Sequence, residues 1–287
     1  MTGRLPEVFY PDYREFLRLR NSANDGFMAL AVSAQLSSHF LQLTKGSERT
    51  LVEIFPAVTN VSHFNLKSAH ALEELTRAEY LLALMAVPYH LGIFEDYVAR
   101  TKNLLRRSKT PRAKKATKRQ KNTDAITAWL SSEYGTVLPT ETTGVLTVYK
   151  NLRHDLLHKG GKATADYSKT YLDEIEAAFE YWGIRPEGNV QALTNGQQIR
   201  LSFGDLKLIL ACVKRQAREI NVALQTLIPH TAWAEVIVDD YLGTHQHKAL
   251  NTEQHLRKCI GFTRKYYAAL GIDPKLVQEQ LKRQNVI

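Results

Sequence analysis

Apolar residues return at helical spacing through most of this chain, and that spacing restricts it to a fold built from helices. The clearest example is "GDLKLILACVKRQAREINVALQTLI", residues 204–228, where apolar residues follow alternating four- and three-residue steps. Residues spaced in this way share one face of a helix. Because three heptads are common in globular chains, we expect this face to pack into a core rather than to form a dimer zipper. The face consists of Leu206, Leu210, Val213, Ala217, Ile220, Leu224 and Leu227.

Further helices are predicted earlier in the chain. One covers about residues 24–43. Another begins at about Asn65, is interrupted or kinked at Pro88, and resumes to about Leu105. Residues 123–135 and the stretch that ends in "LRHDLLHKGG" give two more. The amphipathic spacing of all four segments indicates an all-α fold.

Two short motifs mark the ends of elements in the second half. Asn195-Gly196 lies between two short apolar stretches, a pattern that predicts a tight turn in a small β-hairpin. Asp273-Pro274 has the chemistry of a helix start, because aspartate caps the free N–H groups and proline suits the first turn. We therefore expect one hairpin in an otherwise helical chain, and a last short helix near its end.

The composition is that of an ordinary globular protein, with 44% hydrophobic and 23% charged residues among 287. This length allows one or two domains. The stretch "MTGRLPEVFY" lacks the apolar run of a secretion signal, and "YLLALMAVPYHLGIF" is too short and too interrupted for a membrane span. Cys212 and Cys259 lack metal-ligand spacing. We expect a cytoplasmic protein with reduced core thiols and no contact with a membrane.

The positive charge of the chain is concentrated between residues 106 and 121. This stretch holds nine lysines and arginines and no acid, and nine equals the formal net charge of the whole chain, +9. Pro111 and the lack of an apolar pattern predict a loop between helices. We call this loop the basic segment. Its cations are Arg106, Arg107, Lys109, Arg112, Lys114, Lys115, Lys118, Arg119 and Lys121.

Two interpretations of the basic segment stay open. It is either a solvated spacer, or an arm that binds RNA phosphates and gains affinity by releasing counterions. Neither interpretation includes reading of a base sequence, because the segment holds no feature suited to that task. The excess positive charge is compatible with both interpretations and does not choose between them.

The stretch "YKNLRHDLLHKGG", residues 149–161, is the richest in reactive side chains. On an ideal helix, Arg153 and His158 lie about 140° apart, with Leu157 between them and His154 beside His158. A leucine on this second face predicts a seam against another helix. Two-fold pairing of the face would bring Arg153 and His158 opposite their counterparts in a second copy. The opposite, core-facing side is formed by Val145, Val148, Tyr149, Leu152 and Leu156.

An ordinary helix end explains part of the same pattern. Arginine and histidine on helices are usually surface residues, and Lys159-Gly160-Gly161 is a good terminator with a cation in the last turn. Asp155 falls elsewhere on the helical wheel, where we expect a surface or helix-pairing carboxylate. The spacing of Arg153 and His158 alone therefore does not distinguish a catalytic pair from a solvated face.

The sequence "LRHDLLHKGG" resembles the signature of HEPN domains, the all-helical higher-eukaryote and prokaryote nucleotide-binding superfamily. That signature is an arginine, a polar residue, three further residues and a histidine, which Arg153, His154 and His158 fill in order. As in the superfamily, the motif follows a pair of long helices and precedes two glycines. The resemblance covers roughly residues 65–230 and is specific at the motif.

The resemblance implies a division of the chain into three parts. Residues 1–64 would form an N-terminal helical segment. Residues 65–230 would form a HEPN-like helical bundle that contains the basic segment, 106–121, and the small β-hairpin as an insertion. Residues 231–287 would add extra C-terminal helices.

HEPN ribonucleases cleave RNA without a metal or other cofactor, in an active site shared between two protomers, and the resemblance implies the same here. His158 would exchange protons with the ribose 2′-OH and the leaving 5′-oxygen. Arg153 would stabilise charge on the phosphorane, and His154 would orient His158 or the phosphate. Active members often carry a polar or acidic residue on the earlier helix pair, which makes Glu95 and Asp96 possible supporting residues.

The resemblance thus implies a homodimeric endoribonuclease of the toxin or antiviral-defence kind, with RNA as substrate and an antitoxin or other regulatory protein as a further partner. Two alternatives stay open. One is a non-catalytic HEPN-like module that binds RNA or protein through the same face. The other is a helical accessory protein whose nucleic-acid binding depends on the basic segment.

The interpretation of the basic segment as an RNA-binding arm can be tested by neutralising about five of its cations. We expect weaker binding of different RNA sequences by about the same factor. The slope of log affinity against log salt concentration should become less steep by about 0.7 for each phosphate of single-stranded RNA that the variant no longer neutralises. Filter binding over a range of salt concentrations measures both. Equal affinity and an equal slope in the neutralised variant would identify the segment as a spacer or as a site for an acidic protein.

Overall fold

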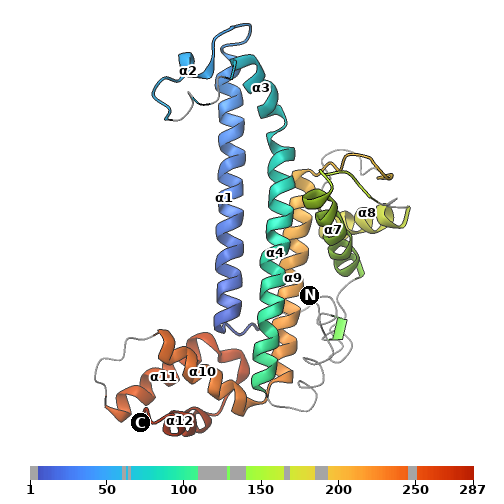
Figure 1. Cartoon of the computed structure of the whole chain (residues 1–287). Coiled ribbons are helices and arrows are strands. Elements are labelled where there is room, and N and C mark those ends of the chain that lie inside the picture. The colour runs from blue at the N-terminus through green and yellow to red at the C-terminus, as the bar shows by residue number, and fades with distance from the viewer. Residues whose placement is uncertain are drawn as a thin grey trace. The chain divides into compact units, whose positions relative to one another are not determined.

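The structure, a computed structural model, describes residues 6–59, 63, 66–108, 128–129, 140–164, 169–184, 193–244 and 251–287 of the chain. Regular structure among these residues is helical, and no strand occurs there (Figure 1). The prediction of an all-α fold is confirmed at this level. The helices are α1 Pro11–Gln42, α2 Leu51–Ile54, α3 Ser68–Thr76, α4 Ala78–Arg107, α7 Thr140–His158, α8 Lys169–Trp182, α9 Phe203–Leu227, α10 His230–Thr244, α11 Thr252–Tyr266, the 3-10 turn η2 Ala268–Leu270 and α12 Pro274–Arg283.

Helix α4 differs most from the sequence-based expectation. It is continuous through Pro88, so the interruption that the sequence allows there is not observed, while the alternative of a kink stays a prediction. Ala86, Val87 and Leu91 around the proline are all buried, so tertiary packing outweighs the one backbone hydrogen bond that proline removes. The helix also continues to Arg107, so the first cations of the basic segment are helical rather than part of a loop.

Helix α4 is also the one described helix that is long and apolar enough to cross a membrane by length and composition. Of its most apolar window, 61% is buried inside the protein. A core helix of a soluble protein meets the same test, so length and apolar composition do not distinguish a membrane-spanning helix from a core helix here.

The expected hairpin at Asn195-Gly196 is not observed as such. The tight turn itself is present, since Gln197 N–H donates to the Thr194 carbonyl at 3.1 Å and Gly196 has φ of +83°. The segment after the turn pairs instead with residues 161–163, through bonds of Ala163 with Gly196 and Gln197. Most of the apolar stretch before the turn lies outside the described residues.

Contacts divide the chain into two compact units. Unit 1 consists of residues 1–19, 92–142 and 213–287, and unit 2 consists of residues 20–91 and 143–212. The long helices α1, α4 and α9 each contribute to both units. The three-part division expected from the sequence stays a prediction, because these units follow contacts rather than likeness to a known domain.

Unit 1 is built around buried aromatic side chains and one buried carboxylate. The Tyr10 ring lies 5.7 Å from that of Trp233 on α10, and the Tyr10 hydroxyl is 2.8 Å from that of Tyr97 on α4. The Asp240 carboxylate accepts two hydrogen bonds from Arg14 and one from the Tyr267 hydroxyl. Burial, and then the charge of Asp240, raises the pKa of Tyr267 above its ordinary value. These contacts tie the N-terminal segment to the C-terminal helices, which Figure 1 shows in red.

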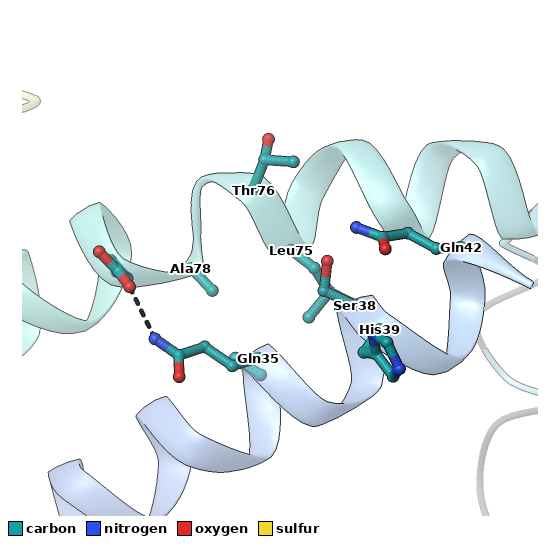
Figure 2. A pocket seen from close by; sticks show the side chains of 9 residues that line it. Gln35, Ser38, His39, Gln42, Leu75, Thr76 and Ala78 are labelled. Atoms are coloured by element: carbon teal, nitrogen blue, oxygen red, sulfur yellow. Dashed lines mark hydrogen bonds between the residues drawn. The ribbon is translucent and has the colours of Figure 1, made fainter.

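Unit 2 contains the carboxy-terminal part of α1, which packs beside α3 and the first turns of α4. Gln35 donates to Glu79 at 3.0 Å, and the Phe27 ring lies 6.1 Å from Tyr89. Figure 2 shows the groove between these helices, with a volume of about 310 Å³. Amide, hydroxyl and imidazole groups line much of it, among them Gln35, Ser38 and His39.

Among the side chains of unit 2, His90 on α4 is almost fully buried. Its Nδ1 lies 2.8 Å from the Ala86 carbonyl oxygen, while Nε2 makes no hydrogen bond within the described part of the chain. Burial lowers the pKa of His90, and the nearby charge of Arg20 lowers it further. The folded protein therefore keeps this imidazole neutral at pH values where the unfolded chain has bound a proton.

We expect acid to destabilise the fold through His90. Its folded pKa lies below its unfolded value of about 6.5, so stability is complete above that value and falls with decreasing pH until the folded pKa is reached. One proton accounts for at most about 1.4 kcal/mol per pH unit. Thermal melts between about pH 7.5 and 5 measure the slope.

His90→Phe should reduce that slope, with His230→Phe as the control for loss of an exposed imidazole. An unchanged slope in the His90→Phe protein would remove His90 as the cause.

Candidate catalytic site on helix α7

The core-facing side of α7 is as the sequence predicts. The five residues expected there, Val145, Val148, Tyr149, Leu152 and Leu156, are all buried. The Tyr149 hydroxyl donates to the Asp205 carboxylate, which also accepts bonds from Ser202 at the start of α9. Ser202 and Asp205 form a reciprocal cap on that helix, since the Ser202 hydroxyl also accepts from the Asp205 N–H. The motif helix is thus fixed in the core and bonded to the first turn of α9.

The three motif residues occupy the opposite, accessible side of α7. His154 and His158 are exposed, and their ring centroids are 5.1 Å apart. Arg153 is half-buried one position before His154. Leu157 is 59% exposed, which is large for an apolar side chain in the middle of a polar motif. The predicted second face, with a leucine between the arginine and the histidines, is therefore present.

Asp155 lies inside the protein, not at the surface position that we considered for it. Its side chain is buried, with 2% of the residue exposed. One carboxylate oxygen accepts from the Thr164 N–H at 2.9 Å, and the other accepts from the Thr164 hydroxyl at 2.7 Å. This carboxylate binds the loop that follows the helix, because a buried charge requires hydrogen-bond partners.

The two glycines after the motif allow the chain to reverse next to its last turn. Gly160 and Gly161 have φ of +64° and +75°, values that residues with a β-carbon rarely adopt. A β-carbon on Gly161 would also lie 2.7 Å from the Gln198 amide nitrogen. The Gly161 N–H donates back to the Asp155 carbonyl at 3.2 Å. The glycine pair therefore ends α7 sharply and brings Thr164 to Asp155.

The stretch around the motif is cationic. Between residues 142 and 164 the only acid is Asp155, which is buried and bonded to Thr164. The same stretch carries four formal cations in addition to the histidines. They are Lys150, Arg153, Lys159 and Lys162. Such a stretch favours phosphate over a neutral ligand, because every accessible formal charge on it is positive.

The possible supporting acids lie in the other compact unit. Glu95 and Asp96 belong to unit 1, whereas the motif belongs to unit 2. Asp96 is exposed and accepts a hydrogen bond from Arg100 at 2.8 Å, and Glu95 is half-buried. Their supporting role at the motif stays a prediction.

Only the start of the basic segment is described by the structure. Arg107 forms an ion pair with Asp239 at 2.6 Å, and Arg106 donates to Asn103 at 3.1 Å. Both side chains thus have partners within the protein, and their assignment to RNA stays a prediction. The other seven cations lie outside the described residues, namely Lys109, Arg112, Lys114, Lys115, Lys118, Arg119 and Lys121.

Other residue types that often do chemistry give no second site in the described part of the chain. No group of three or more His, Cys, Asp or Glu there is arranged to hold a metal ion. Cys212 and Cys259 are free and buried, as expected, and burial raises the pKa of each thiol to about 12. A thiol with so high a pKa stays protonated at neutral pH and is therefore not a thiolate nucleophile.

Comparison with known proteins gives no relative from which a role could be transferred. No family model matches the chain, and no curated protein or solved structure is significantly similar to it. The resemblance to HEPN domains therefore depends on Arg153, His154, His158 and the glycines that follow them.

The Asp155–Thr164 pair was not anticipated from the sequence, and its removal should loosen the end of α7. We expect Asp155→Ala to lower the free energy of unfolding by about 2 kcal/mol, because two donors lose a charged acceptor. Urea denaturation measures the change. Asp173→Ala on the exposed face of α8 is the matched control, and an equal, small effect of both substitutions would contradict the role given to Asp155.

Proposed function

We propose that this protein is a metal-independent endoribonuclease of the HEPN type, with a toxin or antiviral-defence role. The observation that carries the proposal is the accessible end of α7. There, two imidazoles lie 5.1 Å apart next to Arg153, on a stretch with no exposed acid. The side chains needed for RNA cleavage by the neighbouring 2′-hydroxyl are thus together on one helix end.

In this mechanism the ribose 2′-oxygen attacks the adjacent phosphorus, and the bond from phosphorus to the 5′-oxygen breaks. His158 takes the proton of the 2′-hydroxyl or returns a proton to the leaving 5′-oxygen. Arg153 donates to the phosphate oxygens, on which negative charge increases in the transition state. His154, whose ring contacts that of His158, orients it or binds the phosphate. The products are a 2′,3′-cyclic phosphate and a 5′-hydroxyl.

A shared active site is part of the proposal. The exposed Leu157 gives the motif face an apolar centre with charged and titratable groups around it. Burial of that leucine against a second copy would be favourable and would bring two sets of Arg153 and His158 together. The homodimer, the RNA substrate and a regulatory antitoxin are proposed on this basis and on the resemblance.

The pair of imidazoles favours catalysis over simple binding. A face that only holds phosphate is served by lysine and arginine, which stay charged at physiological pH. Histidine adds a group that exchanges protons near neutral pH, a property that binding alone does not require. The ring contact between His154 and His158 places two such groups at one point.

His158→Ala should slow cleavage of single-stranded RNA by at least about 100-fold, the usual scale for loss of general acid–base catalysis. The purified wild-type protein should leave 2′,3′-cyclic phosphate ends, with or without a chelator. End-group analysis of a labelled RNA and single-turnover rates provide the readout, and His230→Ala is the control for an exposed histidine elsewhere.

Two results would count against the proposal. One is a folded His158→Ala protein that cleaves RNA at the wild-type rate. The other is activity that disappears with the chelator and returns with magnesium.

A further inference from the structure

A second surface of unit 2 is apolar where a solvent-exposed helix is normally polar. Residues 26–44, most of them in the carboxy-terminal part of α1, contain no aspartate, glutamate, lysine or arginine. A helix that is apolar or uncharged on all sides is normally enclosed by other structure. Here only one side of α1 is enclosed, as Ala31 and Leu41 are buried while large apolar side chains on the other side are not.

Four of the exposed apolar side chains in this stretch form one continuous row, while Leu30, which is 53% exposed, lies outside it. They recur every four residues, and each is about half exposed, with Leu36 at 56% and Phe40 at 57%. Residues at i and i+4 are neighbours on a helix surface, so the four side chains form a ridge. We call this ridge the α1 stripe. It consists of Met28, Val32, Leu36 and Phe40, and Leu43 extends it beyond the end of α1.

We propose that the α1 stripe is an interface between two antiparallel copies of this chain. The first argument is charge. In a two-fold contact the same face meets itself, so a formal charge close to the two-fold axis would lie near its own copy. The net charge of the chain is +9, yet the stripe and both of its flanks carry none of it. The face is therefore compatible with its own copy without like-charge repulsion.

The second argument is the spacing. The four positions are symmetric about residue 34, so an antiparallel copy brings Met28 opposite Phe40 of the second copy and Val32 opposite its Leu36. Each of these four side chains then meets another of the four, while Leu43 lies opposite Asp25 of the second copy. Ridges of the i and i+4 kind interdigitate at a crossing angle of about −50°.

The size of the stripe sets the expected strength. From Met28 to Phe40 it is about 18 Å long, on a helix about 10 Å wide. A contact of that size is smaller than the roughly 800 Å² per partner of a standard stable interface. We therefore expect association in the micromolar range. A membrane surface is a poorer match, because helices that lie on membranes carry lysine and arginine beside their apolar face, and this stretch has neither.

The experiment is sedimentation velocity on the full chain from about 1 to 100 µM, in a Leu157→Glu background that removes the association proposed for the motif face. Val32→Glu/Leu36→Glu places two carboxylates in the stripe. Ala99→Glu/Asn103→Glu places the same charges with the same spacing on an exposed side of α4, and is the matched control. We expect the Leu157→Glu protein to dimerise with increasing concentration, the stripe variant in the same background to associate at least about ten-fold more weakly, and the control to remain within about two-fold of the Leu157→Glu protein.

Orientation is tested by mixing Val32→Cys and Leu36→Cys proteins under mild oxidation. The native thiols Cys212 and Cys259 are buried and do not compete. An antiparallel contact gives a disulfide between the two variants in preference to a disulfide within either one. A preference for 32–32 and 36–36 disulfides would indicate a parallel contact and would overturn the proposal.

Other results also overturn it, and they are distinct from failure of the proposed ribonuclease. One is a wild-type protein that remains monomeric at 100 µM. Another is a dimer that Leu157→Glu dissociates and Val32→Glu/Leu36→Glu does not, which would assign association to the motif face alone. A third is monomeric protein that binds phosphatidylcholine–phosphatidylserine vesicles only while the stripe is intact. RNA cleavage is measured separately and decides none of these outcomes.

Discussion

The buried carboxylate of Asp155 needs partners for both of its oxygens, and the irregular part of unit 2 is arranged around that need. Thr164 donates to each of these oxygens, and the preceding residue, Ala163, pairs with the turn at Asn195-Gly196. An ionised carboxylate without partners would cost several kcal/mol in such a place. The last turn of α7, the glycine loop and the turn before α9 therefore form one assembly. The exposed histidines therefore lie on the end of α7, and these contacts fix the opposite side of that helix end.

Unit 1 satisfies its own buried carboxylate in another way. Asp240 is bonded to Arg14 and Tyr267, which come from opposite ends of the chain, whereas Asp155 is bonded to a residue nine positions away. Much of the bonding around the motif is therefore local, within residues 149–164, and the bond from Tyr149 to Asp205 adds a contact with α9. This locality explains why a short stretch of sequence was enough to locate the candidate site, although no known protein is similar to the whole chain.

Periodicity alone was sufficient for part of the fold. It predicted the core face of α7 and the α-helical class. A capping motif, not periodicity, predicted the start of α12 at Asp273. Periodicity was not sufficient for Asp155. On the helical wheel this residue lies next to Val148, at the edge of the core face, but burial of a carboxylate depends on a partner in a loop that periodicity does not describe. The same limit applies to Pro88 and to the segment after Gly196, because packing and long-range pairing decide both.

The bond between Asp155 and Thr164 also has a consequence for how this sequence can change over generations. Loss of the threonine hydroxyl alone leaves a buried charge short of a donor, and loss of the carboxylate alone leaves the hydroxyl and an amide without their acceptor. A serine at position 164 would keep both donors, whereas an apolar residue there would remove one of them. The structure therefore couples the two positions, so that the cost of a change at one depends on the residue present at the other.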